Sequence, residues 1–207
     1  MKKYLLTVFS WLIIGLTLLP VTTQAAGGPV EMLQSVADQM IASLKANKTT
    51  LKENPNLVYS LAYKIIVPHA DLDEMSKRVL PPQTWNSASA GQRQEFKREF
   101  TTLLVRTYAS ALAEYKDQTV RFFPVRGGYQ GKSTVKVNSQ IVRSDGPSIS
   151  VNYSLVYAGS GWRLYDMTVE GVSMLQSFRS QFSDQLARGN MASLIKTLKQ
   201  HNSSSGD

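Results

Sequence analysis

The stretch YDMTVEGVSM, from Tyr165 to Met174, decides how this chain folds, because it predicts the end of a strand, a sharp turn and the start of a helix. Gly171 permits the backbone angles that such a turn needs. Ser173 and Gln176 have the spacing of a capping box, which predicts that a helix begins after Ser173. The chain therefore passes from sheet to helix at a defined point.

The same stretch carries two carboxylates, Asp166 and Glu170, whose spacing raises the question of a catalytic pair. Residues four apart on a regular strand point the same way at about 13 Å, beyond the roughly 5 to 9.5 Å between the acid and base of a glycosidase. We therefore interpret the pair as structural. Asp166 is expected to meet a cation or a backbone group, and Glu170 is expected to serve the turn.

Upstream of this stretch, apolar residues alternate with polar ones, which is typical of antiparallel strands with one buried face. Val135, Val137 and Ile141 alternate in this way with Lys136 and its polar neighbours. Turn-rich segments separate four such runs. The pattern predicts a meander of strands over residues 119–125, 133–143, 148–157 and 161–170.

Helices are predicted on both sides of the meander from apolar residues at helical spacing. Pro55 is expected to be the first residue of the second helix and Pro68 to stop it, while Asp71 and Glu74 have capping-box spacing for the third. The longest helix carries a continuous apolar stripe and is expected to be the spine of the molecule. The predicted helices cover residues 30–44, 55–67, 71–80, 96–115, 172–186 and 191–198.

The order of helices, meander and helices predicts an α+β fold, with helices packed on one face of a curved, mainly four-stranded antiparallel sheet. The interior between the two layers has two interpretations. The chain has seven methionines, whose side chains adapt in shape, and nine tyrosines, whose hydroxyl groups can reach solvent. Both residue types suit a deformable apolar pocket with a solvent-exposed rim. An ordinary hydrophobic core uses the same residues, so the pattern leaves an apolar ligand as one of two possibilities.

Residues 1–25 have the pattern of a secretory signal peptide, in which two lysines precede an apolar run and small residues allow cleavage near Ala25 or Ala26. A retained membrane anchor is the competing interpretation, but the run is shorter than the roughly 20 residues that cross a bilayer. We expect an exported, soluble protein. It is expected to have one domain over residues 26–200 and a disordered tail over residues 201–207.

The composition argues against several chemistries. The chain has no cysteine, and its histidines are His69 and His201, so it offers too few ligands for zinc and no serine or cysteine hydrolase arrangement. No metal or cofactor is expected. The formal charge of +8 is not gathered in a dense basic block or an aromatic-basic ladder, so nucleic acid is not an expected partner.

The stretch YDMTVEGVSM, with GW a few residues before it, resembles the signature of the MlaC family of periplasmic phospholipid-binding proteins, also called toluene-tolerance or ABC-transporter auxiliary proteins. The resemblance extends through NPNLVYSLAYKIIVPHADLDEMSKRVL, the Trp85 region, QRQEFKREFTTLLVRTYASALAEY and the strands, and it covers nearly the whole exported chain. One departure is VLPPQTW, because the family tends to carry a glycine after the leucine where this chain has Pro81-Pro82.

The resemblance implies a shuttle that carries phospholipid between an outer-membrane lipoprotein-porin complex and an inner-membrane ABC transporter with an MCE-domain subunit, and so maintains outer-membrane lipid asymmetry. It implies acyl tails enclosed between helices and sheet, with no catalysis. We expect a monomer. Two other functions stay open: an exported enzyme that acts on a small apolar molecule through Asp166 and a tyrosine, and an adaptor that binds envelope proteins through its helices.

Lipid-contacting residues are expected on the motif, on the alternating strands and on the longest helix. They are Phe100, Leu104, Tyr108, Leu112, Val135, Val137, Val151, Tyr153, Leu155, Tyr165, Met167, Val169, Val172 and Met174. Lys64, Arg78, Arg98 and Arg106 are candidates for contact with head-group or partner charge, although a solvated helix face is the simpler interpretation of each.

Overall fold

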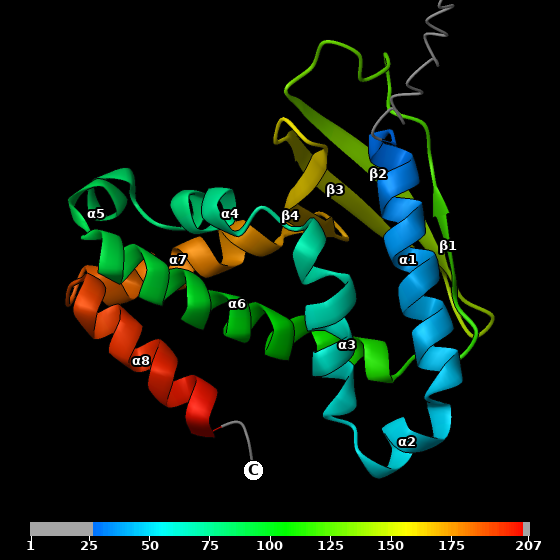
Figure 1. Cartoon of the computed structure of the whole chain (residues 1–207), viewed down its shortest axis with the longest axis horizontal. Helices are drawn as coiled ribbons and strands as arrows, with labels where there is room; N and C mark the ends of the chain where they lie inside the picture. Colours follow the sequence, from blue (N-terminus) through cyan, green and yellow to red (C-terminus); the bar gives the residue numbers. More distant parts are fainter. Residues whose placement is uncertain (1–26, 205–207) are drawn as a thin grey trace, which may run out of the picture.

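The computed structural model describes residues 27–204, in which helices precede a sheet and two further helices follow it (Figure 1). The helices are α1 (Pro29–Ala46), α2 (Lys48–Glu53), α3 (Leu57–Ile65), the short 3-10 helix η1 (Val67–His69), α4 (Leu72–Val79), α5 (Pro82–Ser87), α6 (Ala90–Ala113), α7 (Met174–Leu186) and α8 (Met191–Ser204). The strands are β1 (Thr119–Phe122), β2 (Thr134–Val142), β3 (Ile149–Tyr157), β4 (Trp162–Val169) and β5 (Val172–Ser173).

The strands form one antiparallel sheet in the order β1-β2-β3-β4-β5, which confirms the predicted α+β meander. The difference from the predicted four strands is the two-residue β5. In the register, Val137 lies opposite Tyr153, and Tyr153 lies opposite Met167. Directly opposed residues share a face, so these three side chains define what we call the inner face of the sheet.

Helix α1 covers part of the inner face. It packs against β1 and β2 on one side and α3 on the other (Figure 1). Its Leu33 belongs to a buried group that we call the sheet cluster, which consists of Leu33, Val135, Val137, Leu155 and Trp162. The alternation of β2 therefore places Val135 and Val137 in the core, as predicted from the sequence.

Helix α6 is the spine that the apolar stripe predicted, because it contributes to two separate buried groups. The helical cluster lies among α4, α6, α7 and α8, and at its centre four rings pack with centroids between 5.5 and 5.8 Å apart: Phe96, Phe100, Phe178 and Phe182. The α3 cluster consists of Met40, Leu44, Val58, Ala62, Ile65, Val105 and Ala109. One helix therefore joins two cores.

The helix termini correct several predicted boundaries. α6 begins six residues before the predicted Phe96, because Ser89 and Gln92 form a reciprocal capping box. α3 begins at Leu57, so Pro55 precedes the helix. Pro68 lies within η1, where a 3-10 turn continues the chain beyond α3.

The C-terminus differs from the predicted tail over residues 201–207. α8 continues to Ser204, and the Asn202 side chain is buried, where it donates from Nδ2 to the backbone oxygen of Glu99 at 3.0 Å and to Glu99 Oε2 at 2.9 Å. These hydrogen bonds to α6 hold the last helical turn, a tertiary interaction that the polar sequence does not reveal. Residues 205–207, like the predicted signal peptide, lie outside the described residues.

Replacing Asn202 with Ala should lower the free energy of unfolding by about 1–2 kcal/mol, because it removes two hydrogen bonds to α6, one of them charge-assisted. Urea unfolding of the purified protein measures this decrease. Ser203→Ala is the matched control, since Ser203 is exposed on the same helical turn. Equal stabilities of the two variants would contradict the assignment of this turn to the folded structure.

Candidate functional site

The Asp166 carboxylate joins the sheet to α7. Its Oδ1 accepts hydrogen bonds from the backbone N–H of Met167 at 2.8 Å and of Leu175 at 3.1 Å, and its Oδ2 accepts one from the Ser173 hydroxyl at 2.7 Å. Ser173 Oγ in turn accepts from the Gln176 N–H, as its capping position predicted. The expected backbone role of Asp166 is therefore confirmed, and its lone pairs are engaged in support of the helix N-terminus.

The turn between β4 and β5 has two residues in the left-handed region, Glu170 at φ 47° and Gly171 at φ 84°. Two successive positive φ values are the mark of a type I′ hairpin turn, so the chain forms a short hairpin before α7 begins. The Glu170 carboxylate accepts a hydrogen bond from the Ser150 N–H on β3. Glu170 therefore serves the turn, as expected, although the turn leads first into β5.

The predicted lipid-contacting residues fall into different buried groups. Phe100, Leu104 and Met174 belong to the helical cluster, and Tyr108 packs against it. Leu112 packs against the α3 cluster. From the sheet, Val135, Val137 and Leu155 belong to the sheet cluster, with Tyr153 packed against it.

The inner face of the sheet is only partly covered toward β4. Val151 is buried, but Tyr153, Met167 and Val169 are half-buried, and the register places all four on one face. On the helices, Tyr108 and Leu112 are half-buried as well. Apolar side chains with incomplete cover thus lie on both layers of the fold.

Two of the predicted residues have an unexpected position, and one of them leaves the inner face. A β-bulge pairs Ser154 with Asp166 and Leu155 with Leu164, so Tyr165 is an extra residue without a partner on β3 and packs against the helical cluster. Val172 lies directly opposite Val169 and so shares the inner face, but it is 64% exposed because it lies on the two-residue edge strand β5. The bulge therefore removes Tyr165 from the strand alternation, and lipid contact by Tyr165 and Val172 stays a prediction.

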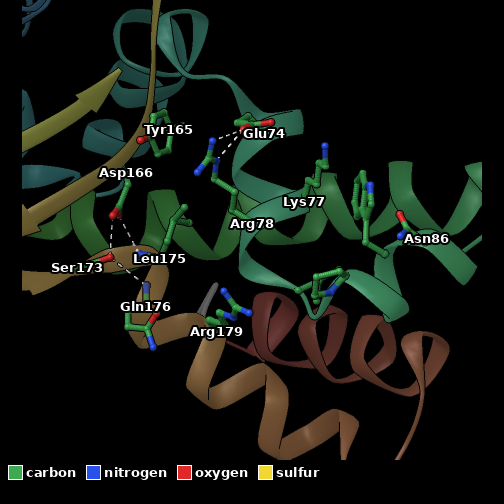
Figure 2. A pocket seen from close by; sticks show the side chains of 13 residues that line it. Glu74, Lys77, Arg78, Asn86, Tyr165, Asp166, Ser173, Leu175, Gln176 and Arg179 are labelled. Atoms are coloured by element: carbon green, nitrogen blue, oxygen red, sulfur yellow. Dashed lines mark hydrogen bonds and ion pairs between the residues drawn. The ribbon is translucent and has the colours of Figure 1, made fainter. Parts of the chain in front are cut away.

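A cleft of about 490 Å³ lies between α4, α5, β4 and α7 (Figure 2). We call it the α4–α7 cleft. Its apolar walls are formed by Leu80, Pro82, Trp85, Tyr165 and Leu175. The polar residues on its lining are Glu74, Lys77, Arg78, Asn86, Asp166, Ser173, Gln176 and Arg179.

The charges of the α4–α7 cleft are unevenly neutralised. Arg78 pairs with Glu74 at 2.6 Å, and its guanidinium carbon lies 4.3 Å from the centroid of the Tyr165 ring. Among residues 27–204, Lys77 and Arg179 have no hydrogen-bond or ion-pair partner, and both are exposed. Tyr165 and Arg78 were predicted from the sequence to contact lipid or head-group charge, whereas Lys77 and Arg179 were not, because they lie on helices whose polar faces look solvated.

Burial raises the pKa of two tyrosines, Tyr153 on the inner face and Tyr108 on α6. The Tyr153 phenol has a raised pKa because it is desolvated. The pKa of Tyr108 is also raised, mainly by burial and further by the negative charge of Asp166. Both phenols stay neutral at physiological pH, which is compatible with an apolar interior.

The described residues offer neither a metal cage nor a membrane-spanning helix. Among residues 27–204, no group of three or more His, Asp or Glu side chains is arranged to hold a metal ion. In the same part of the chain, no helix combines the length and apolar character that crossing a membrane requires.

Comparison with known proteins identifies the class to which this fold and apolar interior belong. A phospholipid-binding protein from Ralstonia solanacearum, solved in complex with a phospholipid, superimposes with a TM-score of 0.79 at 26% identity, covering 87% of this chain and all of that one. The toluene tolerance protein ttg2D of Pseudomonas putida is 31% identical over 187 residues, which are 90% of this chain and 86% of that protein.

A third relative is the intermembrane phospholipid transport system binding protein MlaC of Haemophilus influenzae, 28% identical over 183 residues, which are 86% of this chain and 84% of that protein. The family model of the MlaC protein matches residues 34–200. The chain therefore belongs to the MlaC family.

Gly171→Ala should lower the free energy of unfolding by about 1–2 kcal/mol, because alanine at φ 84° is strained. An added Cβ there meets no atom within 4 Å, so the cost is backbone strain alone. Gly91→Ala is the control, since it lies in α6 without a positive φ and a Cβ there meets its neighbours at ordinary distances. Thermal and urea unfolding compare the two, and an unstrained, fully stable Gly171→Ala protein would refute the turn assignment.

The free energy of unfolding should fall as the pH rises above about 10, because the unfolded chain then loses phenolic protons that folded Tyr153 retains. The stabilisation is complete below the unfolded pKa and is lost as the pH rises through the folded one. Tyr153→Phe should reduce this decrease. Urea unfolding at pH 8 and pH 10.5 measures it, and identical pH dependence in both proteins would contradict the burial of this phenol.

Proposed function

We propose that this protein is a periplasmic phospholipid-binding shuttle that carries lipid between the outer and inner membranes and maintains outer-membrane lipid asymmetry. The observation that carries the proposal is membership of the MlaC family together with a structural neighbour solved with a phospholipid. Half-buried apolar side chains on the inner face of the sheet and on α6 support it. Acyl tails would occupy this interior.

The proposed cargo requires movement of the layers. Residues expected to touch lipid are divided among the helical, α3 and sheet clusters, so two acyl tails need these clusters to separate in part. The acyl tails then fill the space between the apolar side chains that move apart. Each buried methylene group contributes about 0.8 kcal/mol of favourable transfer free energy. Adaptable tyrosine and methionine side chains, such as Tyr153 and Met167, suit such repacking.

The energy of tail burial also bears on release. Two acyl chains represent on the order of 20 kcal/mol of gross transfer free energy, so release into water is negligible. Unloading therefore needs a membrane-bound acceptor that offers the tails an apolar path. The proposed partners are an outer-membrane lipoprotein-porin complex and an inner-membrane ABC transporter with an MCE-domain subunit.

The proposed role does not include catalysis. Asp166, the best enzymatic candidate, is committed to three hydrogen bonds that support α7. The named relatives are lipid-binding and tolerance proteins. We propose that residues 1–25 are a signal peptide, that a single domain begins at residue 26 and that the exported protein is a monomer in the periplasm.

Protein purified from the periplasm should yield phospholipid in near-stoichiometric amount when it is extracted with organic solvent and the extract is analysed by mass spectrometry. Met167→Lys should retain less than a tenth of this lipid, because it places a charge on the inner face. Thr168→Lys is the matched control. It carries the same charge one residue further along β4, where the side chain points to the opposite face.

The outcomes separate the alternatives. Loss of lipid in Met167→Lys with retention in Thr168→Lys, at comparable circular dichroism, supports tail binding at the inner face. An absence of phospholipid from the unsubstituted protein would contradict the shuttle proposal. Turnover of a small apolar substrate that Asp166→Asn abolishes would instead favour an enzyme.

A further inference from the structure

We propose that the β1–β2 hairpin docks on the surface of membranes that contain anionic phospholipid, through Arg121, Arg126, Lys132 and Lys136. The contact uses what we call the outer face, the side of the sheet opposite the inner face. This inference goes beyond the proposed function, because it concerns a bilayer that the protein meets and not a lipid that it encloses. Three observations carry it: the unneutralised charge of the hairpin, the common side of its cations, and the polar surface between them.

The β1–β2 hairpin is basic along its whole length. Its sequence has no Asp or Glu between Asp117 and Asp145, whereas it has five cations: Arg121, Arg126, Lys132, Lys136 and Arg143. Among residues 27–204, none of these five side chains has a carboxylate within ion-pair distance. On the helices, by contrast, Arg78, Lys97 and Lys199 each pair with an acidic side chain. The charge of the hairpin is therefore left for an anion outside the chain.

The strand register places two of these cations on the outer face. Val137 lies on the inner face, so the side chain of its neighbour Lys136 points to the outer one. Gln140 is four residues from Lys136 on the same strand and shares its face, and Arg121 lies directly opposite Gln140. Arg121 and Lys136 are both exposed. They therefore project into solvent from one surface of the sheet.

The loop between β1 and β2 adds Arg126 and Lys132 to this surface. Lys132 Nζ donates to the backbone oxygen of Gly127 at 3.2 Å and to that of Gly128 at 2.7 Å, and these hydrogen bonds hold the loop. Carbonyl groups carry no net charge, so the charge of Lys132 persists. Arg126, Lys132 and Lys136 line one hollow of about 340 Å³, which makes the loop cations neighbours of a cation on the outer face.

The outer face of the hairpin is accessible to a large flat partner. Helix α1 packs against β1 and β2 from the inner face, where its Leu33 belongs to the sheet cluster. On the outer face, Thr134, Lys136 and Gln140 are exposed. The hairpin lies at the end of the molecule opposite α5 and α8, so a bilayer can approach it without meeting those helices (Figure 1).

The polar character of this surface favours a bilayer over a protein partner. The outer-face positions of β2 from Thr134 to Gln140 are Thr, Lys, Asn and Gln. Specific protein interfaces have an apolar core with aromatic anchors, which these positions do not supply. Cations spread over a surface are instead attracted by the negative potential of an anionic leaflet, where each strengthens binding about fivefold. The expected contact is peripheral, reversible and sensitive to salt.

The test is sedimentation of the purified protein with vesicles of phosphatidylcholine, prepared with and without about one quarter phosphatidylglycerol. The unsubstituted protein should sediment with the mixed vesicles only. Raising the salt concentration from about 20 mM to about 500 mM should release it, because salt screens the charges. Arg121→Gln/Arg126→Gln/Lys136→Gln should weaken binding at least tenfold, since it removes three cations. This variant keeps Lys132, whose hydrogen bonds hold the loop.

The matched control is Arg179→Gln/Arg188→Gln/Lys196→Gln. It also removes two Arg and one Lys, but from exposed positions on α7, after α7 and on α8. Binding to the mixed vesicles should change less than twofold, because these cations lie away from the hairpin. The two variants have the same net charge, so equal losses of binding would show attraction by net charge alone and would overturn the hairpin assignment.

The orientation of the bound protein is tested independently with a fluorophore. The chain has no cysteine, so a single introduced cysteine carries the label at one chosen point. A fluorophore attached at Gln140→Cys, on the outer face, should be quenched by mixed vesicles that carry a nitroxide on the lipid head group. A fluorophore attached at Ser180→Cys, an exposed position on α7, should keep its intensity. Equal quenching at the two positions would contradict docking through the hairpin.

Failure of the docking proposal is distinguishable from failure of the shuttle proposal. If the unsubstituted protein yields phospholipid on extraction but does not sediment with the mixed vesicles at low salt, the docking proposal is wrong and the shuttle proposal stands. Vesicle binding by a protein that yields no phospholipid would support docking and contradict the shuttle. If the protein binds polyglutamate through the same three cations but does not bind vesicles, the surface fits an acidic protein segment and the membrane proposal is overturned.

Discussion

The rest of the structure depends on the hydrogen bonds of the Asp166 carboxylate. One carboxylate on the last full strand accepts from the backbone of that strand, from the first turn of α7 and from the Ser173 side chain that caps it. A negative charge at a helix N-terminus is stabilising, and here it also anchors the helix to the sheet. The hairpin turn, the helical cluster and the α4–α7 cleft are all assembled around this junction.

The division of the apolar interior into three clusters sets how the molecule can hold a large apolar ligand. α6 contributes to the helical and α3 clusters, whereas α1 contributes Leu33 to the sheet cluster. The half-buried residues Tyr153 and Met167 lie where these clusters leave the inner face uncovered. Half-buried side chains have less packing to lose than the buried ring group around Phe100, so we expect the molecule to open beside the sheet.

The fold was largely predictable because its signals are local. Alternation placed Val135 and Val137 on the buried face of β2, and helical spacing identified α6 as the spine. The capping role of Ser173 followed from its distance to Gln176 alone. The site was less predictable: the β4 bulge turned Tyr165 toward the helices, and the edge position of β5 left Val172 exposed. Neither event changes the hydrophobic pattern from which the alternation was inferred.

The sequence by itself determined the order and kind of the elements, the turn at Gly171, the structural role of Asp166 and, through the motif, the family. These features arise from interactions within a few residues along the chain, which a single sequence records. The tertiary structure alone decided which apolar residues share a cluster, that Asn202 completes α8 against α6, and that cations from α4 and α7 line one cleft. Those arrangements depend on packing between segments about a hundred residues apart, where the sequence carries no local pattern to follow.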